Sequence, residues 1–538
     1  MSPKVAIAQI NSTVGDIDGN RMRIAEFSRR AAASGADIVV TPELSLTGYP
    51  PEDLLLNRSF YDSTALALAA LASDLADIPD LHVLVGHHLV TGSGRYNACS
   101  ILSKGKIVAT YCKAALPNHS VFDEKRYFTP GKQPVVFTVK GICFGINICE
   151  DVWSEKAPAR AKQAGADVLL VPNASPYNMN KLSERYDILR ENVSRQGMAV
   201  IYTNLVGGQD ELVFDGNSFA LDHTGQLCAH LRHCDEDIEL LSFEGGKLQP
   251  ARQEKTISTE EEVYRALVLG TRDYVEKNGF PGIILGLSGG VDSALVLAIA
   301  VDALGRERTR AVMMPSPYTA DISIVDAGEM AARLNILYDV IPINDCFTTF
   351  LSTLSYQFAG LAEDATEENV QARIRGTILM ALSNKTGSIV LTTGNKSELA
   401  VGYSTLYGDM AGGFSVIRDV PKTLVYRLCR YRNSISDIIP DRILTRAPSA
   451  ELRQDQRDQD SLPPYDILDA IVQMFMEEEK SLAEIIEAGY DSAVVERILF
   501  LIRRNEYKRR QAAVGIRITP RGFGRDWRHP ITSRYRDR

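Results

Sequence analysis

Long hydrophobic runs are absent from this sequence of 538 residues. No apolar stretch approaches the roughly 18 residues that a membrane-spanning helix needs. The 8 cysteines are scattered without a repeating spacing, which argues against a disulfide framework and favours a reduced, cytoplasmic protein. The opening residues, MSPKVAIAQIN, hold only a short apolar stretch before a polar turn, and they predict a first strand rather than a signal peptide. Membrane proteins and disulfide-rich secreted proteins are therefore excluded as expectations.

The composition that remains is that of an ordinary globular protein, with 45% hydrophobic and 24% charged residues. This length predicts two or three domains. The net charge of −9 hides an asymmetry, because residues 503–538 carry 12 Lys and Arg against 3 Asp and Glu. A basic tail on an acidic body favours a local anionic ligand over nucleic-acid binding, and a solvated surface segment is the alternative.

The first part of the chain, residues 1–246, alternates short β-branched runs with helical stretches. GADIVVTPELS (35–45) and GADVLLVPNAS (165–175) echo each other as a passage from helix to strand. The echo predicts two related α/β units that face each other, although a generic helix–glycine–strand connection explains much of the match.

A polar segment without apolar periodicity, residues 247–258, predicts an interdomain linker. TEEE then caps a predicted helix through residue 276, and GFPGIILGLSGG opens a second α/β domain, residues 259–538. The charged, proline-rich stretch 446–464 is either a mobile lid over a site or a surface loop.

The stretch IILGLSGGVDSALVLAIAV predicts a buried strand, a tight turn and a helix. Glycines let the backbone approach a ligand, and the free N–H groups at the helix start attract an anion. No Lys-Ser or Lys-Thr follows the glycines, so the loop is not a Walker motif. A purely structural glycine turn is the alternative.

This loop resembles the SGGxDS loop of ATP pyrophosphatases, which split ATP between its α and β phosphates. The resemblance implies a doubly wound parallel sheet of Rossmann-like type, with Asp292 holding a Mg²⁺ ion on the phosphates. The implied ATP-binding residues are Gly286, Leu287, Ser288, Gly289, Gly290, Val291, Asp292 and Ser293.

Further stretches of the second domain resemble NAD synthetases within that group. They are EENVQARIRG (367–376), LTTGNKSELAVGYSTLYGD (391–409), EYKRRQ (506–511) and the flap-like SAELRQDQRDQDSLPPYDILD (449–469). The resemblance implies that Thr393 contacts ATP, that Asn369, Glu398 and Lys508 contact deamido-NAD, and that Glu398 shares the metal. Taken singly, each stretch is also explained as a solvated helix face or a cap.

In the first domain, GICFGINICEDVW (141–153) places Cys149 at a predicted turn from strand to helix, where a nucleophile is accessible to substrate. A lone cysteine is usually an inert core residue, so Cys149 needs partners. Two other predicted strand ends supply them, with Glu43 in VVTPEL and Lys113 in TYCKAALP. A carboxylate can accept the thiol proton, and an ammonium group can stabilise a tetrahedral oxyanion.

This Glu–Lys–Cys set resembles the nitrilase superfamily over residues 1–245, which implies a four-layer α-β-β-α sandwich. Glu124, in FDEKRYFTPG, is implied as a second carboxylate that supports the lysine and the substrate. NASPYNMNK matches the glutamine-binding stretch of the glutaminase domains of NAD synthetases, which implies glutamine contacts for Ser175 and Lys181. LPNHSVFDE departs from the family's pattern, because His119 stands where a tyrosine often contacts glutamine.

Histidines and cysteines gather in HTGQLCAHLRHC, at His223, Cys228, His230, His233 and Cys234. Zinc is one interpretation. We instead expect a hairpin and a half-solvated alternating strand, with His233 facing away from the others, and therefore neither zinc nor haem. His87 and His88 are expected to pack at a strand end.

Both halves together resemble glutamine-dependent NAD synthetases. The resemblance implies release of ammonia from glutamine through a thioester on Cys149, ATP-dependent adenylation of deamido-NAD, and displacement of AMP by ammonia. The implied ligands are small molecules and Mg²⁺, without nucleic acid or membrane, in a homo-oligomer paired through the second domain. Alternatives are an amidotransferase for another carboxylate, an amidase with a degenerate partner domain, and a non-enzymatic nucleotide- or nucleic-acid-binding protein.

Overall fold

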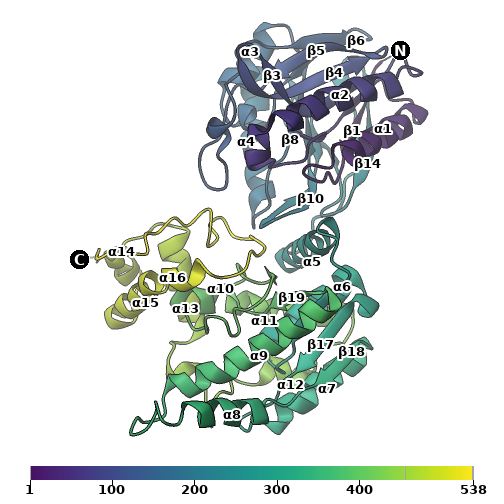
Figure 1. Ribbon diagram of the computed structural model, residues 1–538. Coiled ribbons are helices and arrows are strands. Elements are labelled where there is room, and N and C mark those ends of the chain that lie inside the picture. Colours follow the sequence, from purple (N-terminus) through teal and green to yellow (C-terminus); the bar gives the residue numbers. More distant parts are fainter. Residues whose placement is uncertain (1, 455, 536–538) are drawn as a thin grey trace. The chain divides into compact units, whose positions relative to one another are not determined.

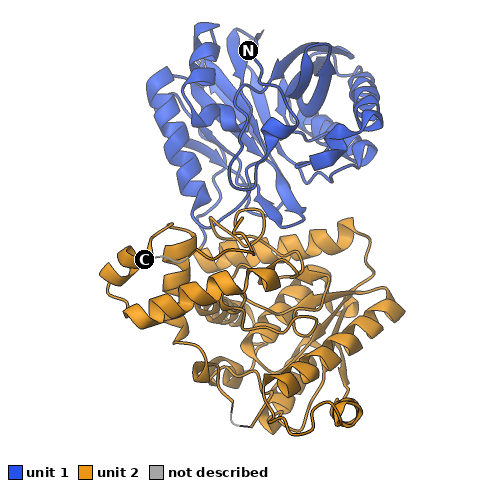
Figure 2. Ribbon diagram, turned by 60° about the vertical axis from the view of Figure 1, so that its left-hand side comes forward, with its two compact units in different colours: residues 1–257 blue, residues 258–538 orange. Residues whose placement is uncertain are grey.

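The computed structural model describes residues 2–454 and 456–535 and divides into two compact units, Met1–Ile257 and Ser258–Arg538 (Figure 2). Asp455 of the flap-like stretch and residues 536–538 of the basic tail lie outside the described residues. The expected linker begins with β15 (Lys247–Leu248), which pairs with β14 (Asp237–Glu244) and so extends a sheet of unit 1. Within the described ranges, every helix is too short or too polar to span a bilayer.

Unit 1 is built on two large sheets and a small hairpin (Figure 1). The seven-stranded sheet has the order β15-β14-β1-β2-β3-β4-β5, with β1 (Lys4–Gln9), β2 (Ile38–Val40), β3 (His82–Thr91), β4 (Gly94–Ser103) and β5 (Lys106–Cys112). The six-stranded sheet has the order β13-β12-β9-β8-β7-β6, with β6 (Val136–Val139), β7 (Ile142–Ile146), β8 (Val168–Asn173), β9 (Ala199–Asn204), β12 (Phe219–Leu221) and β13 (Leu227–His230). The hairpin joins β10 (Val206–Gln209) to β11 (Leu212–Asp215).

Strand alternation places the core of unit 1 in three layers. Along β1, Val5 and Ile7 enter the cluster between the two sheets, whereas Ala6 and Ala8 enter the cluster under the helices of the first sheet. The outer helices are α1 (Ile17–Ala33) and α2 (Arg58–Asp74) on the first sheet, and α3 (Lys156–Gln163) and α4 (Lys181–Gln196) on the second. The predicted α-β-β-α sandwich is therefore confirmed.

The echoing stretches of the sequence occupy corresponding places in the two sheets. β2 lies between parallel neighbours β1 and β3, and β8 lies between parallel neighbours β7 and β9. Each strand is fully buried and ends close to a residue of the candidate site. The prediction of two related units that face each other agrees with this arrangement.

Two local predictions in unit 1 are wrong. The segment 227–234 is not half solvated, because all its described side chains except Leu227 and Arg232 are buried. Residues 252 and 254 hydrogen-bond to the backbone of His230, and Ala251 packs into the core between the sheets. His233 does not face away from its neighbours, since His230 and His233 both contact Asn217. His87 and His88 lie within β3 rather than at its end.

Unit 2 contains a five-stranded parallel sheet with the order β18-β17-β16-β19-β20. Its strands are β16 (Ile283–Gly286), β17 (Thr309–Met313), β18 (Leu337–Val340), β19 (Ile389–Thr392) and β20 (Phe414–Ser415). The chain starts in the middle and adds strands outward in both directions, which is the doubly wound order predicted from the sequence. The crevice at the carboxyl ends of β16 and β19, where the order reverses, is where such sheets bind ligands.

Helices cover this sheet and build a separate helical cluster (Figure 1). They are α5 (Thr259–Lys277), α6 (Val291–Leu304), α7 (Asp321–Leu334), α8 (Asn344–Leu354), α9 (Ala365–Thr386), α10 (Lys396–Val401), α11 (Lys422–Ile435), α12 (Asp441–Thr445), α13 (Tyr465–Met476), α14 (Leu482–Glu487), α15 (Ser492–Arg504) and α16 (Glu506–Arg509). The residue that caps α5 is Ser258, whose side chain accepts from the N–H of Glu261, so the cap precedes TEEE by one residue.

Candidate active sites

The nucleophile of unit 1 sits on a sharp turn after β7. Cys149 begins a short 3₁₀ helix, Cys149–Trp153, and has a φ of +43°. Non-glycine residues seldom adopt this left-handed conformation, and it is concentrated at functional sites. The side chain is only 4% exposed. The turn therefore presents a cysteine in a strained backbone conformation, as the sequence predicted.

The three predicted partners of Cys149 form one buried ion-pair group. The Nζ atom of Lys113, directly after β5, donates to Glu43 Oε1 at 2.7 Å and to Glu124 Oε1 at 2.8 Å. Asn97 Nδ2 also donates to Glu43 Oε1, and the N–H of Ala174 donates to Glu43 Oε2. Glu43 follows β2 and Ala174 follows β8, so this carboxylate joins the ends of the two echoing strands.

Burial sets the protonation of this group. It raises the pKa of Cys149 well above the usual range, and the charge of Glu43 adds to the effect while Lys113 opposes it. Burial alone lowers the pKa of Lys113, but the charges of Glu124 and Glu43 outweigh it and hold that pKa well above normal. Burial raises the pKa of Glu124 to about 7 against the opposing charge of Lys113. The resting site thus contains a protonated thiol beside a charged lysine.

The residues expected to bind glutamine differ in their surroundings. Ser175 is buried after β8, where Arg185 Nε donates to its hydroxyl at 3.1 Å and Asp215 holds that arginine in a buried ion pair. Lys181 lies 4.2 Å from the centre of the Trp153 ring, and burial lowers its pKa. His119 is exposed on the loop before Glu124 and contacts Phe122 through its ring.

In unit 2 the glycine loop connects β16 to α6 as predicted. Gly289 has a φ of +80°, and a Cβ atom there would lie 2.5 Å from the carbonyl oxygen of Ser323. Only glycine fits this close approach to the start of α7. The hydroxyls of Ser288 and Ser293 hydrogen-bond to each other at 3.1 Å inside the loop. The loop leaves the first N–H groups of α6 directed at a ligand position.

Two carboxylates predicted to hold a metal meet beside this loop. Asp292 lies in the first turn of α6 and Glu398 in the first turn of α10, and Lys422 at the start of α11 contacts both. The Lys422–Glu398 distance is 3.1 Å, and Asn395 Nδ2 donates to Asp292 at 2.9 Å. Burial raises the pKa of Glu398 to about 8, with Lys422 opposing and Asp292 adding to the rise.

The remaining predicted residues of unit 2 are distributed around this centre. Thr393 follows β19 and is half-buried. Asn369 on α9 accepts from the hydroxyl of Thr405 at 2.7 Å. Lys508 on α16 donates to the carbonyls of Gly402 at 2.8 Å and Ser404 at 2.7 Å, and therefore ties the basic tail to the loop after α10.

The stretch 446–464 is docked rather than free in the described residues. Glu451 accepts from the hydroxyl of Ser323 at 2.6 Å, and Gln371 Nε2 donates to the carbonyl of Leu452 at 2.9 Å. Asp458 is buried and accepts from Tyr465 at 2.7 Å. The charge of Asp458 also contributes to the raised pKa of Glu398, so the stretch reaches the carboxylate centre.

Sequence reasoning missed three polar residues at these centres. Lys422 bridges the two carboxylates, Arg375 donates from α9 to the carbonyl of Met314, and Asn97 holds Glu43. Arg375 has no carboxylate within ion-pair distance among the described residues, and burial lowers its pKa to about 10. A charge buried after an apolar stretch, as Lys422 is after SVIRDVP, was the available signal.

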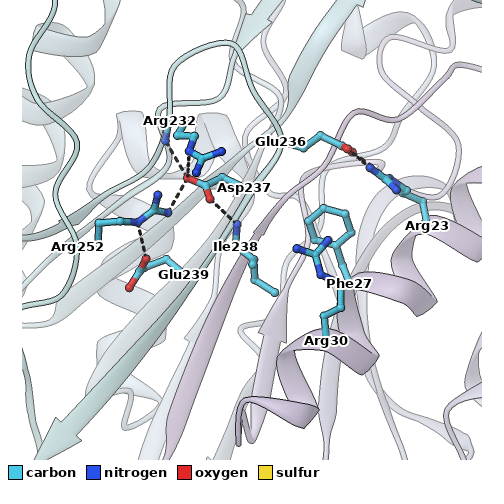
Figure 3. Close-up of a pocket in the computed structure, with 9 residues that line it drawn as sticks. All are labelled: Arg23, Phe27, Arg30, Arg232, Glu236, Asp237, Ile238, Glu239 and Arg252. Carbon is cyan, nitrogen blue, oxygen red and sulfur yellow. Dashed lines mark hydrogen bonds and ion pairs between the residues drawn. The ribbon is translucent and has the colours of Figure 1, made fainter.

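A surface cavity of about 450 Å³ in unit 1 is not the candidate site. Its polar walls come from α1 and the start of β14, and the side chains there are largely paired with one another (Figure 3). Arg252 bonds to Asp237 and Glu239, and Arg23 contacts Glu236. None of the residues that form the buried group around Cys149 lines it.

Comparisons with known proteins agree with the division into two units. Residues 4–242 match the carbon-nitrogen hydrolase family, and residues 263–512 match the NAD synthase family. A protein of Acinetobacter baylyi described as a glutamine-dependent NAD(+) synthetase is 47% identical over 543 residues, with 99% of each chain covered. A Thermotoga maritima protein of the same description is 44% identical over 572 residues, again with 99% of each chain covered.

Solved structures give the same result for the whole chain. The glutamine-dependent NAD+ synthetase of Acinetobacter baumannii, solved with ADP, has 44% identity and a TM-score of 0.81, covering 99% of this chain and 98% of that one. The synthetase of Cytophaga hutchinsonii, at 22% identity and a TM-score of 0.85 with the same coverage, supports the fold. With both halves matched over almost their full length, this chain belongs to the family of glutamine-dependent NAD(+) synthetases.

Proposed function

We propose that this protein converts deamido-NAD to NAD⁺ with ATP, using ammonia that its first unit releases from glutamine. The observation that carries the proposal is the pairing, in one chain, of a buried Glu–Lys–Glu–Cys centre with a glycine loop beside two carboxylates. The products are NAD⁺, AMP, diphosphate and glutamate. The carboxylate of deamido-NAD is a poor electrophile, and adenylation gives it a good leaving group.

In unit 1, Cys149 Sγ attacks the side-chain amide carbon of glutamine while Glu43 accepts the thiol proton. Lys113 stabilises the negative charge that develops on the amide oxygen. Glu43 then returns a proton to the departing nitrogen, which leaves as ammonia, and water hydrolyses the thioester to glutamate. The bonds of Lys113 to Glu43 and Glu124 support this assignment, because they hold the ammonium fixed before substrate arrives.

Glutamine recognition is assigned to three residues around this centre. The buried hydroxyl of Ser175 is fixed by Arg185, and Lys181 lies beside Trp153 with a lowered pKa. His119, where a tyrosine is common in the family, would contact glutamine from the exposed loop. Its imidazole can hydrogen-bond like a phenol hydroxyl, so the contact is retained with a different pH dependence.

In unit 2, the loop from Gly286 to Ser293 would hold the phosphates of ATP. Its backbone N–H groups lie at the start of α6, and Gly289 allows the close approach of the loop to α7. Ser288 and Ser293 contribute hydroxyl donors, and Thr393 contacts the nucleotide from the end of the adjacent strand β19. Attack by the deamido-NAD carboxylate on the α-phosphorus releases diphosphate, and ammonia then displaces AMP.

The donor set beside the loop fits Mg²⁺. Oxygens of Asp292 and Glu398 converge on the ammonium group of Lys422, which marks a position that attracts a cation. No group of three or more potential ligands was found in the described residues, and Mg²⁺ commonly takes its other ligands from phosphates and water. When bound, Mg²⁺ would neutralise charge on the phosphates of ATP.

Deamido-NAD is assigned to Asn369, Glu398 and Lys508. Asn369 and Glu398 lie on α9 and α10, which flank the crevice at the ends of β16 and β19. Lys508 places positive charge at the loop after α10, where it holds two carbonyls in the absence of ligand. A dinucleotide with a diphosphate suits this local positive charge.

The proposal extends to assembly and location. A homo-oligomer, a dimer or larger, would form through unit 2, where α8 leaves Phe350 exposed and Tyr356 lies exposed just beyond it. Gel filtration with light scattering tests this part. The substrates ATP and glutamine point to the cytoplasm.

The direct test is to incubate the purified chain with deamido-NAD, ATP, Mg²⁺ and glutamine and to identify every product. We expect NAD⁺, glutamate, AMP and diphosphate in equal amounts. ADP with orthophosphate would contradict adenylation, and an inert deamido-NAD would mean that another carboxylate is the acceptor. Glutamate formation without any ATP-dependent product would leave only an amidase.

A further inference from the structure

A carboxylate outside the Glu–Lys–Glu–Cys group joins the strand ends that carry Lys113 and Cys149. Asp151 is fully buried, two residues after the nucleophile. Its Oδ1 accepts from the N–H groups of Ala114 at 2.9 Å and Ala115 at 2.7 Å. Its Oδ2 accepts from the N–H of Ile148 at 2.9 Å and the hydroxyl of Tyr111 at 2.8 Å.

The four donors come from two different sheets. Tyr111, Ala114 and Ala115 surround Lys113 at the end of β5, an edge strand of the seven-stranded sheet. Ile148 directly precedes Cys149, after β7 of the six-stranded sheet. Pairing within each sheet does not fix the distance between these two strand ends, and apolar packing between sheets is not directional.

A local role in capping the 3₁₀ helix explains only one of the four bonds. The bond from Ile148 closes the turn at Cys149, whereas the other three bonds reach residues 36 to 40 positions away along the chain. Hydrogen bonds to an ionised carboxylate are stronger than neutral ones, and a buried carboxylate with four donors has its lone pairs occupied. The arrangement is therefore complete and costly to alter.

We propose that Asp151 is a positioning residue that holds Lys113 and Cys149 at working separation by clamping their two strand ends together. It acts through the backbone on either side of the reacting groups and does not touch glutamine. This inference rests on the glutaminase half of the proposed function.

Asp151→Asn is the decisive variant. Asparagine keeps one oxygen but turns an NH₂ group toward N–H donors, so one side of the clamp must open. A misplacement of about 1 Å costs on the order of 100-fold in rate. We expect kcat for glutamine hydrolysis to fall by that factor while KM for glutamine stays within about threefold, because the binding residues are untouched.

The chain supplies its own controls. Synthesis from ammonium salt uses unit 2 alone and should match wild type. Asp167→Asn is the matched variant, because Asp167 also accepts a backbone N–H of β7, from Cys143 at 3.0 Å, but is exposed and joins nothing to Lys113. It should leave glutamine hydrolysis unchanged.

Tyr111→Phe removes one donor and keeps the carboxylate, so it carries the test if Asp151→Asn fails to fold. It should lower kcat by a few-fold without changing KM. Unchanged kcat in folded Asp151→Asn, or in Tyr111→Phe where Asp151→Asn does not fold, would overturn the inference. A rise in KM with kcat retained would do the same. Failure of wild type to use glutamine would instead refute the proposed function.

Discussion

The two catalytic centres of this chain handle charge in opposite ways. The centre of unit 1 is complete without ligand, since Lys113 sits between Glu43 and Glu124 and all three side chains are closed off from solvent. The centre of unit 2 is partly open, since Asp292 and Glu398 each keep 17% of their side-chain surface exposed and share a single lysine. The first must act on a neutral amide, and the second must receive a polyanion with its cation.

The backbone shows the same contrast. In unit 1 the left-handed conformation falls on the nucleophile itself, Cys149, whereas in unit 2 it falls on Gly289, which has no side chain. A reacting thiol needs a fixed direction, while a phosphate cradle needs bare N–H groups and close approach. Each centre is thus built for what its substrate lacks.

The largest effect should come from removing one reacting group in each centre. Cys149→Ala should lower glutamine-dependent synthesis at least about 1000-fold and leave ammonia-dependent synthesis largely intact. Asp292→Ala should abolish synthesis from either nitrogen source, because adenylation is common to both routes. Steady-state rates with glutamine and with ammonium salt measure this. Equal losses from both sources in Cys149→Ala, with the protein folded, would contradict the division of labour.

Removing the lysine of each centre should separate a closed site from an open one. Lys113→Met leaves two buried carboxylates without a cation and should cost about 3–5 kcal/mol of the unfolding free energy of unit 1. Lys422→Met should cost unit 2 less, since its carboxylates reach solvent, and millimolar Mg²⁺ should recover part of the loss. Calorimetry of the ligand-free chain with and without Mg²⁺ tests both. Recovery of Lys113→Met by Mg²⁺ would remove the distinction.

A pair of adjacent glycines tests the backbone half of the comparison. Gly289→Ala introduces a Cβ at 2.5 Å from the carbonyl of Ser323 with φ +80°, whereas Gly290→Ala meets only the Ser288 hydroxyl at 3.3 Å. The first should destabilise unit 2 by about 1–3 kcal/mol. The second should cost less than about 1 kcal/mol. Thermal unfolding without nucleotide measures the difference, and equal shifts in Tm would mean that the turn tolerates a side chain.

The smallest effect concerns pH. Burial raises the pKa of Glu124 from 4.5 to about 7, so between these values the folded state holds a proton that the unfolded chain has released. The unfolding free energy of unit 1 should therefore fall as pH rises from 4.5 to about 7, and this contribution should level off above that window. Glu124→Gln should flatten the slope. A wild-type Tm for unit 1 that rises steadily through this range would be inconsistent with a raised pKa.

The sequence predicted the fold and the reacting residues of unit 1 because each of them follows a recognisable apolar strand. Glu43, Lys113 and Cys149 come directly after β2, β5 and near the end of β7, and parallel neighbours bring such ends together. The same reasoning located the glycine loop between β16 and α6. Local pattern and motif agree at these positions.

Prediction failed where the deciding contact is distant in the chain. Lys422 lies 130 positions from Asp292, and nothing in its neighbourhood indicates the bridge. The alternation over 227–234 suggested a solvated face, but residues 251–254 and Tyr186 of α4 cover that segment. Asp151 looked like one of two acidic residues after a cysteine, and only the fold places it beside Ala114 and Ala115.

The raised pKa of Cys149 has a consequence for survival of the enzyme under oxidative stress. Peroxides and alkylating electrophiles consume thiolates far faster than thiols, and they need access to the sulfur. Between turnovers this sulfur is shielded and carries its hydrogen, so such reagents would spare it. Damage should then concentrate on molecules caught in mid-reaction, and an idle enzyme should outlast a busy one.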